Sequence, residues 1–257
     1  MADPNRRRLL AGIAATLSAA ALAGCDNLSQ APWFRRVLHT GEDFNRTVQR
    51  FFLKPTSLAR EFAESDISPA FRANGSTDPD NPDYKALVAN GFADWKLKVG
   101  GLVEKPMEFS LADLRAMPSR TQITRHDCVE GWSCIGKWTG VPLAHVLEQV
   151  KVKPETRFIL FTCFDELEQT LDGSGRYYET LGLEDAYHPQ TILAHGMNGQ
   201  PLAVPHGAPL RVRVERQLGY KMAKYVMQID AIDSFESLGR GNGGFWEDRG
   251  YDWYAGI

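Results

Sequence analysis

The segment Arg125-His126-Asp127-Cys128 places a thiol close behind two basic side chains, with one aspartate between, at the end of a predicted strand. A cysteine in such a position is more often a small buried hydrophobic residue than a ligand. Here Arg125 and His126 could stabilise a thiolate, and the polar turn that follows is an unusual place for a cysteine that only packs. Thiolate is the soft ligand that a high-valent, sulfur-ligated metal centre uses. The segment therefore predicts a metal-ligand thiolate at Cys128.

A second group of candidate residues is cationic. Gly and Pro in the segment 206–211 favour a loop whose backbone can approach a ligand closely. Arg211, Lys221 and Lys224 then supply positive charge on adjacent segments, which suits a phosphate. The alternative is a solvated charged strand in which Glu215 is the ionic partner, and charge alone does not decide between the two interpretations.

Composition limits the class of protein. With 257 residues, 43% of them hydrophobic, the chain can bury a substantial core. The formal net charge of −3 argues against a nucleic-acid partner, so an anion site must be a local cluster of cations. Four cysteines are too few for a disulfide scaffold of this size, and none are spaced as CxxC, so zinc ribbons and iron–sulfur clusters have little support.

Short elements are expected to position these residues. Residues 95–99 alternate apolar side chains with lysines, the period of a half-buried strand. Residues 110–113 match a capping box, which predicts a short helix that stops at Pro118. Residues 122–127 can then form the strand that delivers Cys128.

The remaining pattern predicts an α+β fold. The strictly alternating segment 210–214 predicts a strand with one buried face, and Asn198-Gly199 is a turn signal. Further strands are expected at 157–161, 191–194 and 225–232, helices at 35–52 and 142–150, and a loop at 74–79. Many short strands interleaved with short helices indicate one mixed-sheet α+β domain over residues 31–257, with a core at about 68–235 and an irregular C-terminal arm at 236–257.

Residues 1–30 have the pattern of an export signal. Paired arginines at 6–8 precede an uncharged Ala- and Leu-rich run that ends at Ala23 and is short for a membrane span. This pattern resembles a twin-arginine signal, a route for proteins that fold around a cofactor before crossing the membrane. Leu22-Ala23-Gly24-Cys25 resembles a lipobox, and the alternative is an ordinary cleaved signal with an incidental cysteine. We expect a periplasmic protein that is lipid-anchored to a membrane through Cys25.

Several of these segments together resemble one known family. Residues 192–202, 206–211 and 219–224 match, in order and spacing, the molybdopterin-binding segments of the sulfite-oxidase superfamily of molybdopterin-dependent oxidoreductases. Cys128 to Trp132, followed by residues 138–143, looks like the molybdenum-ligand segment of that family. The chain is most similar to the branch of the periplasmic methionine-sulfoxide reductase catalytic subunit, over about residues 68–235. The resemblance implies a sulfite-oxidase-type mixed-sheet fold and a Mo-molybdopterin cofactor.

The resemblance also assigns roles to single residues. Cys128 would be the catalytic metal ligand, beside the two dithiolene sulfurs of the pterin. Tyr177 matches the active-site tyrosine of the family, and Tyr178 is an equally placed alternative. The implied cofactor contacts are Arg72, Ala73, Asn74, His206, Arg211, Met222, Ala223 and Lys224, together with Thr162 or Cys163. A single Arg/Lys cluster fits a lone phosphate better than a dinucleotide form of the cofactor.

Departures from the family pattern shape the functional hypothesis. Sulfite oxidases carry an arginine pair soon after the ligand cysteine, whereas this chain has Gly131-Trp132-Ser133-Cys134. A neutral mouth, shaped by Trp132 and Tyr177, suits the reduction of a neutral S-oxide or N-oxide, with electrons from a membrane cytochrome or another external redox partner. The alternatives are a sulfite-oxidising enzyme and a non-catalytic binding lipoprotein. Cys134 and Cys163 are either free or paired.

Overall fold

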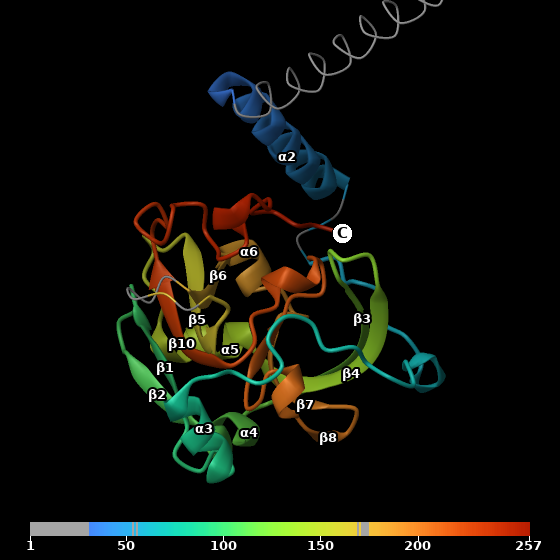
Figure 1. Cartoon of the computed structure of the whole chain (residues 1–257), viewed down its shortest axis with the longest axis vertical. Helices are drawn as coiled ribbons and strands as arrows, with labels where there is room; N and C mark the ends of the chain where they lie inside the picture. Colours follow the sequence, from blue (N-terminus) through green and yellow to red (C-terminus); the bar gives the residue numbers. More distant parts are fainter. Residues whose placement is uncertain (1–30, 53, 55, 169, 171–174) are drawn as a thin grey trace, which may run out of the picture. The chain divides into compact units, whose positions relative to one another are not determined.

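The computed structural model describes residues 31–257, apart from 53, 55, 169 and 171–174. The chain divides at Phe52 into two units, Met1–Phe52 and Leu53–Ile257. The residues 1–30, with the predicted signal and Cys25, lie outside the described residues, so the boundary at residue 30 stays a prediction. Among the described residues of the second unit, two sheets form the framework (Figure 1).

The first sheet has the strand order β2-β1-β10-β5-β6. β1 and β10 run parallel, and the other neighbours are antiparallel. The last strand of the chain, β10, therefore lies in the middle of the sheet, directly beside the first strand, β1. The strands are β1 (Lys96–Gly101), β2 (Met107–Ser110), β5 (Phe158–Glu166), β6 (Arg176–Gly182) and β10 (Val226–Ile232).

The second sheet has the order β3-β4-β7-β8, and β9 also pairs with β7. β3 and β4 form a hairpin in which Asp127 pairs with Ser133, so residues 128–132 are its connecting loop. Asn198 and Gly199 both have positive φ, 51° and 77°, and connect β7 and β8 as the expected tight turn. The strands are β3 (Arg120–Asp127), β4 (Ser133–Pro142), β7 (Ile192–Met197), β8 (Gln200–Pro201) and β9 (Arg211–Arg213).

Short helices cover these sheets. The capping box is confirmed, because the Ser110 hydroxyl accepts from the Asp113 N–H at 3.1 Å and the Asp113 carboxylate accepts from the Ser110 N–H at 2.8 Å. The helices of this unit are α3 (Pro82–Ala89), α4 (Leu111–Ala116), α5 (Leu143–Val150) and α6 (Leu183–Ala186), with 3-10 turns η1 (Glu64–Asp66), η2 (Val204–His206), η3 (Gly219–Lys221) and η4 (Glu247–Arg249). The predicted α+β class is confirmed.

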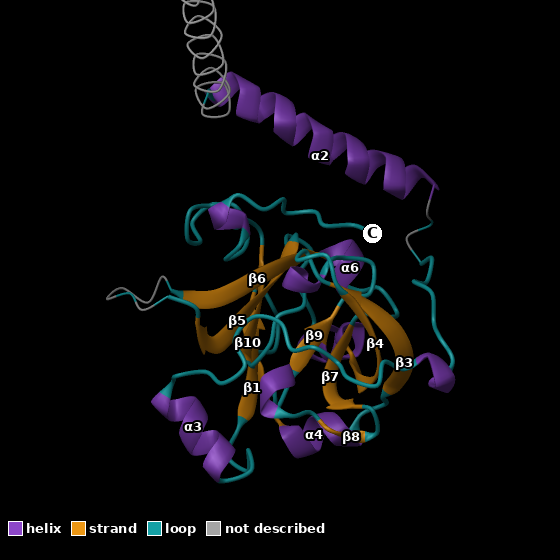
Figure 2. Ribbon diagram, turned by 45° about the vertical axis from the view of Figure 1, so that its right-hand side comes forward, coloured by secondary structure: helices purple, strands orange, loops and turns teal. Residues whose placement is uncertain are grey.

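The main hydrophobic core takes side chains from both sheets. Figures 1 and 2 show β1, β5, β6 and β10 on one side of the unit and β3, β4 and β7 on the other. α5 presents Leu143, Val146, Leu147 and Val150 to this core, all fully buried. Since both sheets contribute side chains to this one core, the sheets are held together, and the loops that connect their strands have fixed positions relative to each other.

The expectation that segment 210–214 has one solvated face is wrong. β9 is limited to Arg211–Arg213, and all three of its residues are buried. Arginine and valine therefore alternate between two faces of the strand that are both buried, and neither face is exposed to solvent. Long cationic side chains are tolerated there because each guanidinium packs over the Trp138 ring, at 5.0 Å for Arg211 and 4.4 Å for Arg213.

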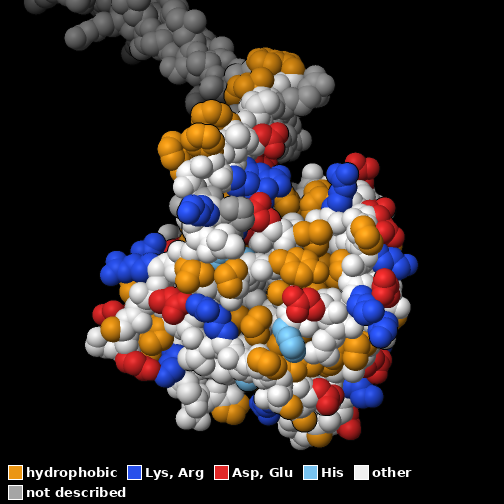
Figure 3. Space-filling view, turned by 180° about the vertical axis from the view of Figure 1, so that it is seen from behind, with side chains coloured by type: hydrophobic (Ala, Val, Ile, Leu, Met, Phe, Trp, Pro, Cys, Tyr) orange, Lys and Arg blue, Asp and Glu red, His pale blue; other side chains and the backbone are white. Residues whose placement is uncertain are grey.

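The first unit contributes one described helix, α2 (Pro32–Phe52), which includes the predicted helix 35–52. Trp33, Phe44 and Phe51 are 56%, 71% and 82% exposed, and their spacing places them on one face of the helix. Figure 3 shows hydrophobic side chains exposed along this helix. Across the described part of the chain, none of the helices is both long and apolar enough to cross a membrane.

Candidate functional site

One cavity contains the predicted ligand cysteine and the predicted tyrosine. The cavity is partly open to solvent, and together with the open space at its mouth it measures about 680 Å³. Cys128 and Tyr177 lie in its wall together with Lys224. The other lining residues come from the loop 74–76, the β3–β4 connection, the end of β5 and the residue after it, η3 and the residue after it, and the C-terminal arm: Asn74, Gly75, Ser76, Val129, Glu130, Asp165, Leu167, Gly219, Tyr220, Met222, Trp246 and Tyr251. A concave site with a few converging polar groups is the usual form of a ligand pocket.

The β3–β4 hairpin positions Cys128. The Cys128 N–H donates to the Trp132 carbonyl at 2.9 Å, and the Gly131 N–H donates to the Cys128 carbonyl at 3.0 Å. Gly131 has φ 84°, a conformation that glycine adopts without strain, so the loop can close within five residues. Gly219 of η3 must also lack a side chain, because a Cβ there would lie 2.3 Å from the His126 ring. The cysteine is therefore held at a tight, close-packed loop.

The basic neighbours of Cys128 do not stabilise a thiolate, which is a correction to the expectation from sequence. Arg125 instead forms an ion pair with Asp127 at 2.9 Å, and its side chain is 56% exposed. Burial is the main cause that raises the pKa of the Cys128 thiol, and it outweighs the backbone hydrogen bond from Glu130, which lowers that pKa. The Glu130 charge raises the pKa further, whereas the Arg72 charge and the Val129 backbone lower it. The free thiol is therefore protonated at neutral pH, and binding of a metal would release that proton.

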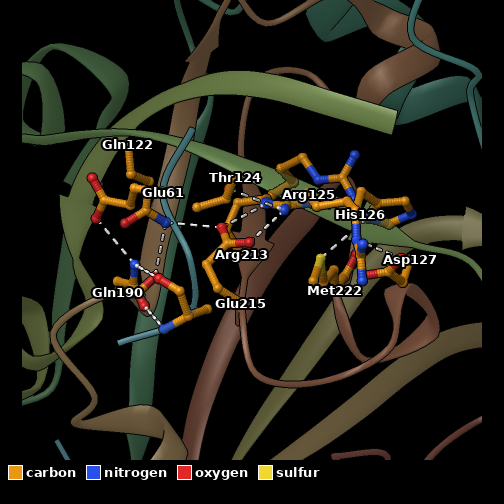
Figure 4. A network of polar contacts seen from close by, with 12 residues as sticks. Glu61, Gln122, Thr124, Arg125, His126, Asp127, Gln190, Arg213, Glu215 and Met222 are labelled. Atoms are coloured by element: carbon orange, nitrogen blue, oxygen red, sulfur yellow. Dashed lines mark hydrogen bonds and ion pairs between the residues drawn. The ribbon is translucent and has the colours of Figure 1, made fainter. Parts of the chain in front are cut away.

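His126 belongs to a buried polar network beneath the site (Figure 4). Its Nδ1 accepts from the Arg213 guanidinium at 3.0 Å and lies 3.3 Å from the Met222 sulfur. Burial and the cations Arg213 and Arg211 hold the pKa of His126 well below its usual value, so the ring is neutral. Arg213 in turn donates to Glu215 at 2.5 and 2.9 Å. Glu215 therefore neutralises Arg213, and Arg211 is left without this carboxylate.

Arg211 and Lys224 are buried cations without an ion pair among the described residues. Arg211 donates to the carbonyls of His206 at 3.1 Å and Met222 at 3.5 Å. Its Nε, like Nδ1 of His206, is buried and has no hydrogen-bond partner within the described chain. Burial and the neighbouring Arg213 lower the pKa of Arg211 to about 9. An anion bound here would compensate this uncompensated positive charge.

Lys224 connects the cation cluster to the loop 74–76. Its ammonium donates to the carbonyls of Asn74 at 2.6 Å, Pro205 at 3.0 Å and Ser76. Burial and the nearby Arg211 lower the pKa of Lys224 to about 7. The predicted contacts Asn74, Met222 and Lys224 thus meet in the cavity wall, with Ala223 buried beside them and with His206 and Arg211 joined to them by hydrogen bonds.

Lys221 does not belong to this cationic pocket, so that part of the predicted cluster is wrong. Its ammonium donates to Glu179 and Glu247, each at 2.6 Å, and all three side chains are buried. Burial and the second carboxylate, Glu247, raise the pKa of Glu179 well above its usual value. Two carboxylates close to one lysine leave this group with no spare positive charge for a phosphate.

The choice between the two tyrosines follows from β6, on which adjacent residues face opposite sides. Tyr177 lines the cavity, and its hydroxyl donates to the Tyr220 carbonyl. Tyr178 donates to Asp248 of the C-terminal arm at 2.5 Å and is outside the cavity wall.

Several predicted residues lie away from the cavity wall. Arg72 is exposed, 3.8 Å from Glu130 and over the Trp132 ring, and Ala73 is likewise outside the lining set. Trp132 contacts His126 and Arg72 and is outside the lining set. Its Nε1 donates at 3.0 Å to Glu130, which does line the cavity, so the role of Trp132 in the mouth stays a prediction.

Neither of the alternatives on β5 lines the cavity. Cys163 is fully buried in the main core, and Thr162 is its partly buried neighbour. Cys134 and Cys163 are both free thiols, which answers the question of their pairing.

Sequence reasoning missed Asp165 and the aromatic residues of the arm. Asp165 is 3% exposed, and its Oδ1 has no hydrogen-bond partner among the described residues. Burial raises its pKa to about 7, although Lys224 acts in the opposite direction. One feature of the sequence points to Asp165: it lies three residues after Thr162, on the extension of the strand predicted at 157–161. Trp246 and Tyr251 carried no comparable signal, because the arm has no periodic pattern.

Comparison with known proteins agrees with this geometry. Residues 85–238 match the family described as "Oxidoreductase molybdopterin binding domain". The "Putative protein-methionine-sulfoxide reductase subunit YedZ1" of Azospira oryzae is 36% identical over 83% of this chain and 73% of its own length. The "Protein-methionine-sulfoxide reductase catalytic subunit MsrP" of Xanthomonas axonopodis pv. citri is 32% identical over 89% of this chain and 70% of its own length. The sulfane dehydrogenase SoxCD of Paracoccus pantotrophus aligns with a TM-score of 0.48 and 24% identity, over 55% of this chain and 39% of that one.

A cavity-lining thiol beside buried cations without an ion pair is the arrangement that a metal-containing, anionic cofactor requires. The chain belongs to the oxidoreductase molybdopterin-binding family and is a Mo-molybdopterin oxidoreductase of the sulfite-oxidase type. The residues present fit that cofactor. Cys128 offers the soft sulfur donor, and the orphaned Nε of Arg211 offers a hydrogen bond to a phosphate.

Proposed function

We propose that this chain reduces neutral S-oxides, with the methionine sulfoxide side chain of proteins as the leading substrate. The observation that carries the proposal is the lining of the cavity around Cys128. Among the described residues, no arginine lines this cavity. Four of the lining side chains are aromatic: Tyr177, Tyr220, Trp246 and Tyr251. A dianion such as sulfite would lose its hydration there without a compensating pair of cations. The relatives named as methionine-sulfoxide reductase subunits support the same choice.

Each residue of the site has a separate role in this proposal. Cys128 would ligate the metal, while Arg211 and Lys224 would bind the phosphate of the pterin. The bound cofactor supplies two-electron oxygen-atom chemistry. Reduction of a sulfoxide consumes two electrons and two protons and yields a thioether and water. Asp165, in the same wall, can hold a proton near neutral pH because burial raises its pKa to about 7.

The proposal includes an external electron donor. Both of the methionine-sulfoxide reductase relatives described above carry the word "subunit" in their names, which supports a redox partner. A membrane cytochrome is the donor that we propose.

The test is a comparison of steady-state rates with the molybdenum-loaded protein. Reduced viologen should be oxidised by methionine sulfoxide and dimethyl sulfoxide, whereas dye-linked oxidation of sulfite should be slow or undetectable. Efficient sulfite turnover with every S-oxide and N-oxide inert would contradict the proposal and favour sulfite oxidation.

Export and anchoring form a separate proposal. We propose that residues 1–30 direct the folded protein to the periplasm and that Cys25 becomes lipidated there. The protein should then fractionate with membranes, and Cys25→Ala should release it to the soluble periplasm. A wild-type protein that is already soluble, with its N-terminus cut elsewhere, would contradict the lipid anchor.

A further inference from the structure

The family match ends at residue 238, and the part of the C-terminal arm beyond it, residues 239–257, supplies part of the cavity wall. Trp246 and Tyr251 line the same cavity as Cys128. The family's shared segments therefore account for the thiol and the cations, while this arm accounts for two of the four aromatic side chains in the wall.

Three of the four aromatic side chains form one continuous surface. The rings of Trp246 and Tyr251 are stacked at 5.4 Å with an interplanar angle of 25°. The Tyr220 ring meets Tyr251 edge-on at 5.1 Å and 82°. A short backbone turn fixes the stack, because the Tyr251 N–H donates to the Trp246 carbonyl at 3.1 Å and Gly250 adopts φ 101° between them.

Buried contacts hold the arm in place on both sides of this turn. Glu247, the residue after Trp246, accepts from the buried ammonium of Lys221 at 2.6 Å. Beyond Tyr251, the Asp252 carbonyl accepts from the Tyr220 hydroxyl at 2.6 Å, and the Ala255 carbonyl accepts from the Leu218 N–H at 2.9 Å. The aromatic surface is therefore fixed by contacts with the protein itself, which lowers the cost of ordering it around a ligand.

The chemistry of this surface selects a neutral, apolar group. Aromatic rings contact sulfur and methyl groups favourably, and Tyr251, 37% exposed, is accessible to an entering molecule. Glu130, a carboxylate in the same wall, is 61% exposed in its side chain and would repel an anionic substituent.

We infer that Trp246 and Tyr251 form a binding subsite for the apolar substituent on the sulfur atom of a neutral S-oxide. This inference rests on the proposed function, and it assigns selectivity among S-oxides to the arm. Substrates with a large apolar substituent should depend on the two rings, whereas dimethyl sulfoxide is too small to use them.

The kinetic test compares methyl phenyl sulfoxide with dimethyl sulfoxide in the loaded enzyme. Tyr251→Leu and Trp246→Leu should raise KM for methyl phenyl sulfoxide about tenfold more than they raise KM for dimethyl sulfoxide. Trp246→Phe should keep the selectivity, because it keeps an aromatic face. Tyr187→Leu is the matched control, since Tyr187 is 39% exposed and lies outside the cavity wall. An unchanged ratio of the two KM values in Tyr251→Leu and Trp246→Leu would overturn the inference.

Equilibrium binding separates this inference from the proposed function. Methyl phenyl sulfone, used as an unreactive analogue, should bind the molybdenum-loaded wild type in a calorimetric titration. Its Kd should rise about tenfold in Tyr251→Leu and stay constant in Tyr187→Leu, with equal molybdenum content in all three proteins. If the wild type reduces no S-oxide, the proposed function fails, and this titration still decides whether the subsite exists. Equal sulfone affinity in wild type and Tyr251→Leu would refute the subsite.

Discussion

Arg211 and Arg213 lie two residues apart on β9, and their buried guanidiniums have opposite surroundings. Arg213 meets a carboxylate, Glu215, at 2.5 Å, whereas Arg211 donates to backbone carbonyls. The same contrast recurs at the end of η3, where Lys221 meets two carboxylates and Lys224, three residues later, donates to carbonyls. Folding alone explains a buried cation that is paired, since the pair is neutralised within the chain. A buried cation without an anion indicates a ligand that brings the negative charge.

The largest effect should come from breaking a paired cation. Arg213→Met would leave the Glu215 carboxylate buried without its partner, so we expect the free energy of unfolding to fall by about 3–5 kcal/mol. Denaturant unfolding of the cofactor-free protein measures this loss. A loss below about 1 kcal/mol would show that Glu215 is neutralised in another way.

The matched variant Arg211→Met should behave in the opposite manner. It removes an uncompensated buried charge, so the cofactor-free protein should be no less stable than wild type. Retention of the cofactor should weaken by roughly 10- to 100-fold, because hydrogen bonds to a charged group contribute about 1.5–3 kcal/mol. Molybdenum and pterin content after purification gives the result. Full occupancy would show that Arg211 does not contact the cofactor.

The pH dependence of stability should distinguish Lys224 from Lys221. Burial and Arg211 lower the pKa of Lys224 to about 7, against 10.5 for an ordinary lysine, and Asp165 opposes this shift. Between these values the unfolded chain binds more protons, so stability rises with pH, by at most about 1.4 kcal/mol per pH unit. Burial acts to lower the pKa of Lys221, but Glu179 and Glu247 and their hydrogen bonds outweigh it and raise that pKa. Lys221 therefore does not make the stability of the protein rise with pH over this range.

Unfolding of the cofactor-free protein from pH 7 to pH 10 tests this prediction. The stability of wild type minus that of Lys224→Met should increase over this range, and the increase should disappear in the loaded protein, because the bound phosphate favours the charged lysine. Parallel curves for the two cofactor-free proteins would argue against a destabilised cation at this position.

The smallest effect is expected for the exposed cation Arg72. Its side chain is 65% exposed and lies 3.8 Å from Glu130, and exposed ion pairs contribute little. Arg72→Ala should change cofactor content far less than Arg211→Met, by about twofold or less. A loss as large as that of Arg211→Met would restore Arg72 as a pterin contact, as the sequence predicted.

The sequence predicts best those features that depend on nearby residues. The Ser110–Asp113 capping box and the Asn198-Gly199 turn follow from local hydrogen bonds and backbone conformation. The position of Cys128 also follows from local pattern, because a short strand leads directly into its turn. Family resemblance then adds Tyr177, Asn74 and Lys224, and all three line the cavity that contains Cys128.

The pairing of charges could not be predicted, because it depends on contacts that are distant in sequence. Lys221 meets Glu179, 42 residues earlier, and Glu247, 26 residues later. The alternation in 210–214 indicated a strand but not that both faces are buried, which required the second sheet around Trp138. Trp246 and Tyr251 belong to an irregular arm, where no period relates sequence to exposure.

The central claim is that Cys128 ligates the molybdenum at which the S-oxide is reduced. X-ray absorption at the molybdenum edge measures it directly, with wild type and Cys128→Ser compared at equal molybdenum loading. Since a hydroxyl is a poor donor to this metal, the variant should show one sulfur neighbour fewer than wild type and should lose reduction of methionine sulfoxide. The same number of sulfur neighbours in both proteins, with wild-type turnover in Cys128→Ser, would contradict the account.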